Sequence, residues 1–211
     1  MKVCEIFTSI QGESSYAGLP CTFIRLTGCN LRCTYCDTTY AYAEGSERSA
    51  EEIMGVVRDS GVKLVEITGG EPLLQEEVYP LVERLLDSGY TVLVETNGSM
   101  SIRKIDRRAV LILDIKTPGS GMSGEMDFSN LTHLKQSDEI KFVLTGRADY
   151  EWAKEIMSKY ALGEKCHVLL SPAFEKLSPQ QLAGWILEDR LDVRLNLQLH
   201  NYIFGPGRKG V

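Results

Sequence analysis

The chain has 211 residues, 43% of them hydrophobic and 25% charged, and is long enough to bury a core without disulfides or a structural metal. Its net charge of −6 argues against a broad surface for nucleic acid or an acidic membrane, because both need clustered lysine and arginine. No stretch resembles a membrane span or a signal peptide. We therefore expect a cytoplasmic protein with one domain over residues 1–211, which binds neither nucleic acid nor membranes.

The predicted elements alternate between strand and helix. Short apolar segments predict strands over residues 22–27, 63–68, 90–95, 109–115, 139–144, 167–170 and 193–199. Helices are expected from a capping box at Ser49 to about Gly61, and over residues 74–88, 150–160 and 179–188. About seven apolar strands joined by helices indicate a mostly parallel sheet, with too few strands for a closed eight-stranded barrel. The predicted fold class is α/β, an open, partial TIM-like barrel.

Polar motifs follow these strands at their carboxyl ends, where parallel sheets of this class bind their ligands. A cysteine-rich loop follows the first predicted strand, and the segment 68–72 (TGGEP) follows the second. Residues 96–98, Lys116, Ser171 and His200 follow later strands. This arrangement predicts a single active site. The glycines of residues 119–124 are compatible with a mobile flap and equally with an ordinary surface loop.

Three of the six cysteines, Cys29, Cys33 and Cys36, lie in one short loop. Three thiolates can hold three corners of a 4Fe–4S cluster, which usually takes four cysteines, so one iron would stay open for a ligand. A zinc site completed by Cys166 or His167 is an alternative, as is a redox pair of the last two loop cysteines. The redox pair would leave Cys29 unexplained.

This cysteine spacing, with Tyr35 before the last cysteine, resembles the signature of the radical S-adenosylmethionine (SAM) enzymes. The segment 69–72 (GGEP), by itself only a turn signal, resembles their glycine-rich segment. The resemblance implies a cluster on the three cysteines and SAM chelated to the open iron. It also implies SAM contacts from Tyr35 near the adenine, from Gly70 and Glu71 at the methionyl end, and from Asn97, Asp114, Lys116 and Ser171 around the ribose and carboxylate.

The flanking segments narrow this resemblance to one family. Residues 7–13, 22–26, 36–38, 197–200 and 209–211 resemble the 7-carboxy-7-deazaguanine synthases of queuosine and deazapurine biosynthesis. Two departures are Ser14, where that family usually has glycine, and Lys209, where arginine is common. The resemblance implies radical ring contraction of 6-carboxy-5,6,7,8-tetrahydropterin to 7-carboxy-7-deazaguanine, with loss of ammonia and with SAM as a true cofactor.

The same resemblance implies the substrate and Mg²⁺ contacts. Glu13 would accept hydrogen bonds from the pterin edge, and Arg25 would bind the substrate carboxylate. Without the resemblance, Glu13 would be interpreted as a solvated loop acid, and Arg25 would equally well be a surface arginine of a strand. Thr38 would be the Mg²⁺ ligand. The remaining implied substrate contacts are Ile10, Gln11, Gly12, Thr68, His200 and Val211. The radical chemistry itself would be carried by SAM and the cluster, so no side chain is assigned as catalytic.

The family resemblance also leads us to expect a homodimer and an electron donor such as flavodoxin or ferredoxin. One rival interpretation is a radical SAM activase, which generates a glycyl radical on a partner protein. That rival explains the cysteines and the GGEP segment, but not residues 11–13, Arg25 or His200. A second rival is a non-catalytic iron–sulfur or zinc protein, which would bind metal without cleaving SAM.

Overall fold

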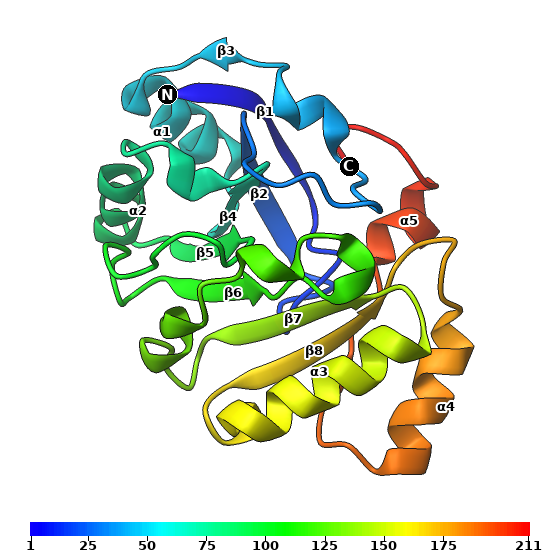
Figure 1. The fold of residues 1–211 in the computed structure, drawn as a ribbon. Coiled ribbons are helices and arrows are strands. Elements are labelled where there is room, and N and C mark those ends of the chain that lie inside the picture. The colour runs from blue at the N-terminus through cyan, green and yellow to red at the C-terminus, as the bar shows by residue number, and fades with distance from the viewer.

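The computed structural model describes residues 1–211, and its nine strands form one curved sheet (Figure 1). The strand order is β3-β1-β2-β4-β5-β6-β7-β8-β9, and no pairing joins the two edges, so the sheet is open. Only β1 is antiparallel to its neighbours. The strand bounds are β1 Lys2–Ile10, β2 Pro20–Leu26, β3 Ser46–Glu47, β4 Leu64–Gly69, β5 Thr91–Thr96, β6 Val110–Asp114, β7 Glu139–Leu144, β8 His167–Pro172 and β9 Arg194–Leu195.

Four of the helices, α1 to α4, cover the outer face of this sheet, and the short α5 lies near the C-terminus (Figure 1). Their bounds are α1 Ala50–Ser60, α2 Val78–Asp87, α3 Arg147–Tyr160, α4 Pro179–Asp189 and α5 Leu199–Phe204. The predicted capping box of α1 is present, because Ser49 and Glu52 each accept a hydrogen bond from the other's backbone N–H. Such a cap is worth about 1 kcal/mol. Apolar residues of the helices and strands share one core of 33 buried residues. None of the helices has the length and apolarity to cross a bilayer.

The predicted open, mostly parallel α/β sheet is confirmed, with two differences in its strands. Strands β1 and β3 were not predicted, because most residues of β1 are half-buried on both faces and lack a clear alternation of apolar and polar side chains. The last predicted strand is reduced to the two residues of β9. As a result, His200 lies in helix α5 and does not follow a strand directly.

The glycine-containing segment 119–124 is bonded to the cysteine loop. Thr34 donates its backbone N–H to the Ser120 carbonyl oxygen over 3.0 Å and its hydroxyl to the Gly119 carbonyl oxygen over 2.8 Å. The N–H of Gly119 in turn donates to Asp149 over 2.8 Å. The structure therefore favours a tethered loop over the mobile flap among the two interpretations of this segment.

Candidate active site

The carboxyl ends of the parallel strands surround a cavity of about 250 Å³. It collects residues from the N-terminal loop, the cysteine loop, β2, β4–β7, α5 and the C-terminal segment. The predicted site residues that line it are Ile10, Gln11, Gly12, Glu13, Arg25, Cys29, Cys33, Tyr35, Cys36, Thr38, Thr68, Gly70, Asn97, Asp114, Lys116, His200 and Val211. The structure thus brings residues from almost the full length of the chain to one place.

Two predicted SAM contacts, Glu71 and Ser171, lie outside this lining. The fully buried carboxylate of Glu71 accepts hydrogen bonds from the backbone of Leu73 and Asn97 and from the Thr96 hydroxyl. The Ser171 hydroxyl is buried and accepts a hydrogen bond from Asn196 over 2.8 Å. The structure therefore gives both side chains a part in holding the strand ends together, and their SAM contacts stay a prediction.

One side of the cavity, which we call the cysteine wall, consists of Cys29, Cys33, Cys36, Gly70 and Asn97. All three cysteines are free thiols and partly exposed. A Cβ on Gly70 would lie 2.0 Å from the Gly28 carbonyl oxygen and 2.7 Å from the Cys29 Cβ. Only glycine allows this approach, which also lets the Glu71 N–H donate to the Gly28 oxygen over 2.7 Å.

The three thiols do not converge on one point, as ligands of a single metal ion would. In a cubane cluster each thiolate binds a different iron, so separated thiols in one loop fit a 4Fe–4S cluster better than zinc. Cys166 and His167 lie at the amino end of β8 and do not line the cavity. They are therefore badly placed to complete a zinc site with the loop, and that alternative loses its fourth ligand.

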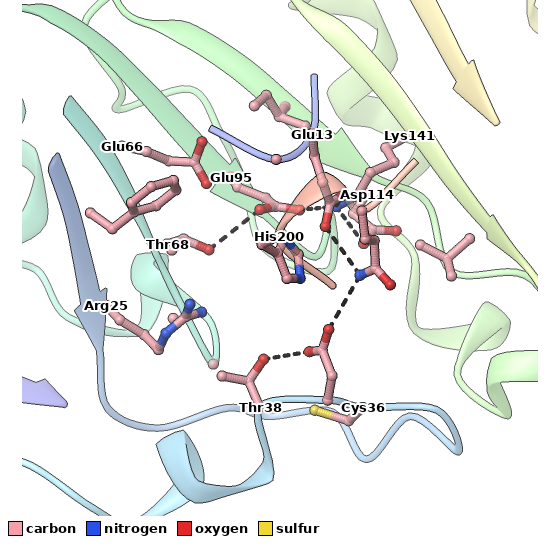
Figure 2. Close-up of a pocket in the computed structure, with 18 of the residues that line it drawn as sticks. Glu13, Arg25, Cys36, Thr38, Glu66, Thr68, Glu95, Asp114, Lys141 and His200 are labelled. Atoms are coloured by element: carbon pink, nitrogen blue, oxygen red, sulfur yellow. Dashed lines mark hydrogen bonds and ion pairs between the residues drawn. The ribbon is translucent and has the colours of Figure 1, made fainter. Parts of the chain in front are cut away.

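The opposite side, which we call the charged floor, consists of Glu13, Glu66, Glu95, Asp114 and Lys141. Lys141 projects from β7 and its Nζ lies 2.8 Å from Glu13 Oε2, 3.7 Å from Asp114 Oδ2 and in contact with Glu95 (Figure 2). Burial would lower the pKa of Lys141, but these carboxylates hold it well above its usual value. Burial would likewise raise the pKa of Glu13, but Lys141 outweighs this and brings it below its usual value. Both groups are therefore charged at neutral pH.

Glu66 is the carboxyl of the charged floor that is not paired with a lysine. It is 3% exposed, and its hydrogen-bond donor is the side-chain amide of Gln11. Burial, and then the nearby charge of Glu95, raises the pKa of Glu66 well above its usual value. The same Gln11 side chain accepts the backbone N–H of Glu13 over 3.0 Å. Glu66 thus fixes the amide of Gln11, which in turn holds the loop that carries Glu13.

Sequence reasoning missed Glu66 and Glu95 as site residues. Each stands in a strand that is otherwise mainly apolar, β4 and β5 respectively. A carboxyl group at such a position is costly to bury unless it is paired or functional. That signal was available in the sequence, but only the sheet register shows that both side chains face the same cavity.

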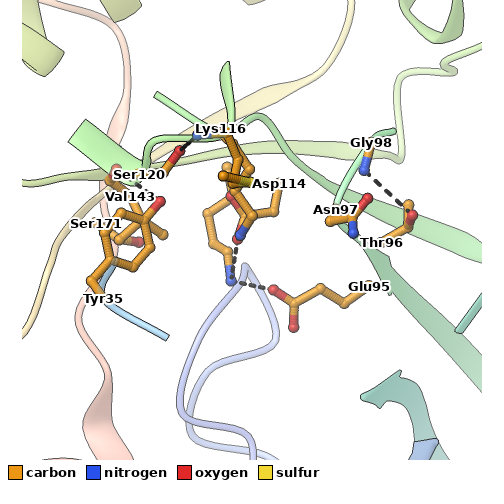
Figure 3. A network of polar contacts seen from close by, with 12 residues as sticks. Tyr35, Glu95, Thr96, Asn97, Gly98, Asp114, Lys116, Ser120, Val143 and Ser171 are labelled. Atoms are coloured by element: carbon orange, nitrogen blue, oxygen red, sulfur yellow. Dashed lines mark hydrogen bonds and ion pairs between the residues drawn. The ribbon is translucent and has the colours of Figure 1, made fainter. Parts of the chain in front are cut away.

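A third group of polar residues surrounds Lys116 (Figure 3). Its Nζ lies 2.7 Å from Asp114 Oδ2 and 6.0 Å from the centre of the Tyr35 ring. The other carboxylate oxygen, Asp114 Oδ1, is buried and has no hydrogen-bond partner. A buried oxygen without a donor is unfavourable, so a polar group of a bound ligand at this position would stabilise the site.

Arg25, Thr38 and His200 face the space between the cysteine loop and the charged floor (Figure 2). The Arg25 Nε donates to Glu5 over 2.8 Å, which orients the guanidinium group. Thr38 donates its hydroxyl to Asp37 over 2.6 Å. His200 packs so closely on Gly12 that a Cβ there would lie 2.6 Å from its Nδ1.

Comparisons with known proteins agree with this geometry. The family model described as "Radical SAM superfamily" matches residues 23–115. The 7-carboxy-7-deazaguanine synthase of Koribacter versatilis is 48% identical to this chain, and that of Chlorobaculum tepidum 44%, with alignments that cover all of this chain and 100% and 97% of the relatives.

Solved structures show the same fold. The crystal structure of QueE from Escherichia coli has a TM-score of 0.78 at 24% identity, over 93% of each chain. Streptococcus suis SuiB bound to S-adenosylmethionine has a TM-score of 0.56 at 16% identity, over 83% of this chain and 48% of that one. With sequence relatives matched over the whole chain and the site at the carboxyl ends of the strands, this chain belongs to the 7-carboxy-7-deazaguanine synthase family and is a radical SAM lyase.

Proposed function

We propose that this chain converts 6-carboxy-5,6,7,8-tetrahydropterin to 7-carboxy-7-deazaguanine with loss of ammonia, in a reaction that depends on SAM and Mg²⁺. The observation that carries the proposal is the single cavity in which the cysteine wall faces the charged floor. A radical generated at one side would meet, at the other, a dense set of groups able to orient a ring rich in hydrogen-bond donors and acceptors.

Membership of the radical SAM superfamily implies a 4Fe–4S cluster and SAM. Cys29, Cys33 and Cys36 are the residues that would hold the cluster. When bound, the cluster and SAM supply a reactive radical that takes hydrogen from the substrate. The chain contributes the backbone of Gly70, which lines the cavity, and Asp114, a lining residue whose Oδ1 has no hydrogen-bond partner.

On the substrate side, Glu13 would accept hydrogen bonds from the pterin edge and Arg25 would bind the carboxylate. The hydrogen bond from Arg25 Nε to Glu5 leaves the terminal nitrogens of the guanidinium for that carboxylate. Thr38 would contribute an oxygen to Mg²⁺, with Asp37 holding the hydroxyl in place. Ile10, Gln11, Gly12, Thr68, His200 and Val211 complete the proposed substrate contacts.

We also propose that residues 1–211 form one domain, since all nine strands belong to one sheet. The proposed homodimer and a flavodoxin or ferredoxin donor follow from the family alone. The rival activase would need a surface for a protein radical acceptor, whereas the residues described here line a cavity of about 250 Å³, a size suited to a small molecule.

The test is anaerobic turnover of cluster-reconstituted protein with 6-carboxytetrahydropterin, SAM, Mg²⁺ and a strong reductant, read by mass spectrometry. The substitution Glu13→Ala should lower turnover about a hundredfold, equivalent to about 2.7 kcal/mol, with unchanged iron content. Glu155→Ala, which removes an exposed carboxylate of α3, is the matched control. If 5′-deoxyadenosine forms without product in the wild type, the substrate is wrong and the activase becomes the better interpretation. Full activity of Glu13→Ala would refute the substrate role of Glu13.

A further inference from the structure

Asn97 joins the end of β5 to the cysteine loop. Its backbone N–H donates to the buried carboxylate of Glu71 over 2.7 Å, which fixes the position of its Cα. Its side-chain Nδ2 lies 3.8 Å from the Cys29 Sγ and 3.1 Å from the Asn30 Oδ1. The amide group therefore reaches the sulfur of the first cysteine of the loop.

The opposite end of this amide is held just as firmly. Asn97 Oδ1 accepts the backbone N–H of Ser99 over 3.0 Å and the Ser99 hydroxyl over 2.6 Å. The side-chain amide of Asn30 donates to the same Ser99 hydroxyl oxygen over 2.8 Å. An asparagine amide can donate twice and accept twice, and here the protein uses all four positions. The side-chain amide of Asn97 thus has no free donor or acceptor for the SAM contact that the sequence predicted.

Cys29 Sγ also receives the backbone N–H of Leu31 over 3.4 Å. Two N–H groups therefore point at this one sulfur atom. A donor is held more strongly by a thiolate than by a thiol, because the acceptor then carries negative charge. Hydrogen bonds to the sulfurs of an iron–sulfur cluster are among the factors that set its reduction potential. Such bonds favour the reduced cluster, which carries the larger negative charge on its ligands.

We propose that Asn97 is a positioning residue of the cluster, whose amide donates to the Cys29 thiolate and stabilises the reduced state. The proposal rests on the proposed function, since it requires a cluster on the three cysteines. The network of Asn30, Asn97 and Ser99 keeps the amide turned so that its donors face the sulfur. Removing the donor should make the cluster harder to reduce without weakening the binding of SAM.

The test compares wild-type protein with Asn97→Leu, which has a similar branched shape and no donor. Ser99→Ala is the matched control, because it removes the hydroxyl contact of Asn97 Oδ1 and retains the donor to sulfur. The readouts are iron content, the midpoint potential from an anaerobic titration followed by electron paramagnetic resonance, and the SAM dissociation constant. We expect Asn97→Leu to lower the equilibrium constant for one-electron reduction about tenfold, or about 59 mV. Ser99→Ala should change it less than about twofold, and the SAM dissociation constant should stay unchanged in both.

An unchanged potential with weaker SAM binding in Asn97→Leu would overturn the proposal and restore the SAM contact. If Asn97→Leu does not load a cluster, Asn97→Ala provides the second test, since it removes the donor with a smaller side chain and adds no charge. Its potential must then fall below that of Ser99→Ala. Failure of both variants to load, with Ser99→Ala loaded, would also overturn the role in tuning the potential. Failure of the wild type to load would instead contradict the proposed function.

Discussion

The cysteine wall and the charged floor face each other across one cavity but are built in different ways. The wall depends on a short loop, close backbone packing at Gly70 and a few side-chain contacts to that loop. The floor is assembled from side chains of distant segments, and its central pair, Glu13 and Lys141, is separated by 128 residues in the chain. A short sequence motif can therefore predict the cysteine wall, whereas the residues of the charged floor come together only in the folded sheet.

The largest effect is expected from Lys141→Met, which removes the shared partner of Glu13, Glu95 and Asp114. Leaving buried carboxylates without a counter-charge should cost about 3–5 kcal/mol of unfolding free energy at pH 7, with loss of turnover. Burial would raise the pKa of Glu13, but Lys141 lowers it. The stability that Glu13 contributes is therefore present above its unfolded pKa, about 4.3, and is lost as the pH falls through its lower folded pKa.

The difference in unfolding free energy between Lys141→Met and wild type should decrease as the pH is lowered toward 4, because the carboxylates left without Lys141 become protonated. Urea unfolding at pH 7, 5.5 and 4 measures this. Lys104→Met breaks an exposed ion pair with Glu76, which solvent screens, and should lower the unfolding free energy far less than Lys141→Met does. An equal loss of unfolding free energy in Lys141→Met and Lys104→Met would show that the charged floor contributes no more to stability than a surface ion pair.

The next effect is expected from Gly70→Ala in the cysteine wall. The added Cβ would collide with the Gly28 carbonyl and the Cys29 Cβ, so the loop must shift, at a cost of about 1–3 kcal/mol. Gly184→Ala in α4 is the control, because no atom lies within 4 Å of its added Cβ and it should stabilise the protein by about 1 kcal/mol. Thermal unfolding and iron content after reconstitution distinguish them. Normal loading of Gly70→Ala would contradict the close packing that defines the wall.

The difference between wall and floor also explains what sequence reasoning could foresee. Apolar strands and capped helices predicted the open α/β sheet, and α1 begins and ends at the residues that its capping box and Gly61 indicated. Strand β1 was not predicted, because a strand that is partly buried on both faces lacks the alternation of apolar and polar residues by which strands are recognised in a sequence. The GGEP segment predicted a glycine under steric restraint, but not that Glu71 would turn inward to bind the end of β5.

The floor could not be foreseen in the same way. The sequence does not show on which side of its predicted strand the Lys141 side chain lies, and Glu66 was not singled out. Their side chains meet because β4, β5, β6 and β7 are neighbours in register and their cavity-facing residues point to the same side. That information lies in the topology, and no short segment of the chain carries it.

A third effect, which is small near pH 5 and grows with pH, isolates the carboxyl group of the floor that is not paired with a lysine. Burial, and then Glu95, raises the pKa of Glu66, so the folded protein binds this proton more tightly than the unfolded chain. Its stability contribution is therefore full below the unfolded pKa of about 4.3 and is lost as the pH rises toward the folded value. Glu66→Gln should remove this loss, so its unfolding free energy should rise relative to that of wild type by at most about 1.4 kcal/mol per pH unit above pH 5. The measurement is the unfolding free energy of both proteins at pH 5, 6, 7 and 8, with Glu155→Gln as control. A difference between Glu66→Gln and wild type that does not change with pH would contradict the binding of a proton by Glu66 in the folded protein.

The smallest effect concerns Ser14, a position at which the family resemblance predicted glycine. It lies in the loop of Glu13 with a φ of 64°, where a Cβ costs about 1 kcal/mol, and its hydroxyl accepts the N–H of Tyr16 over 3.1 Å. Ser14→Ala removes the hydrogen bond and keeps the strain, whereas Ser14→Gly removes both. Glycine should therefore be the more stable of the two by about 1 kcal/mol, against its usual rank below alanine. A higher melting temperature for Ser14→Ala than for Ser14→Gly would mean that this loop, and with it the position of Glu13, is not restrained as described.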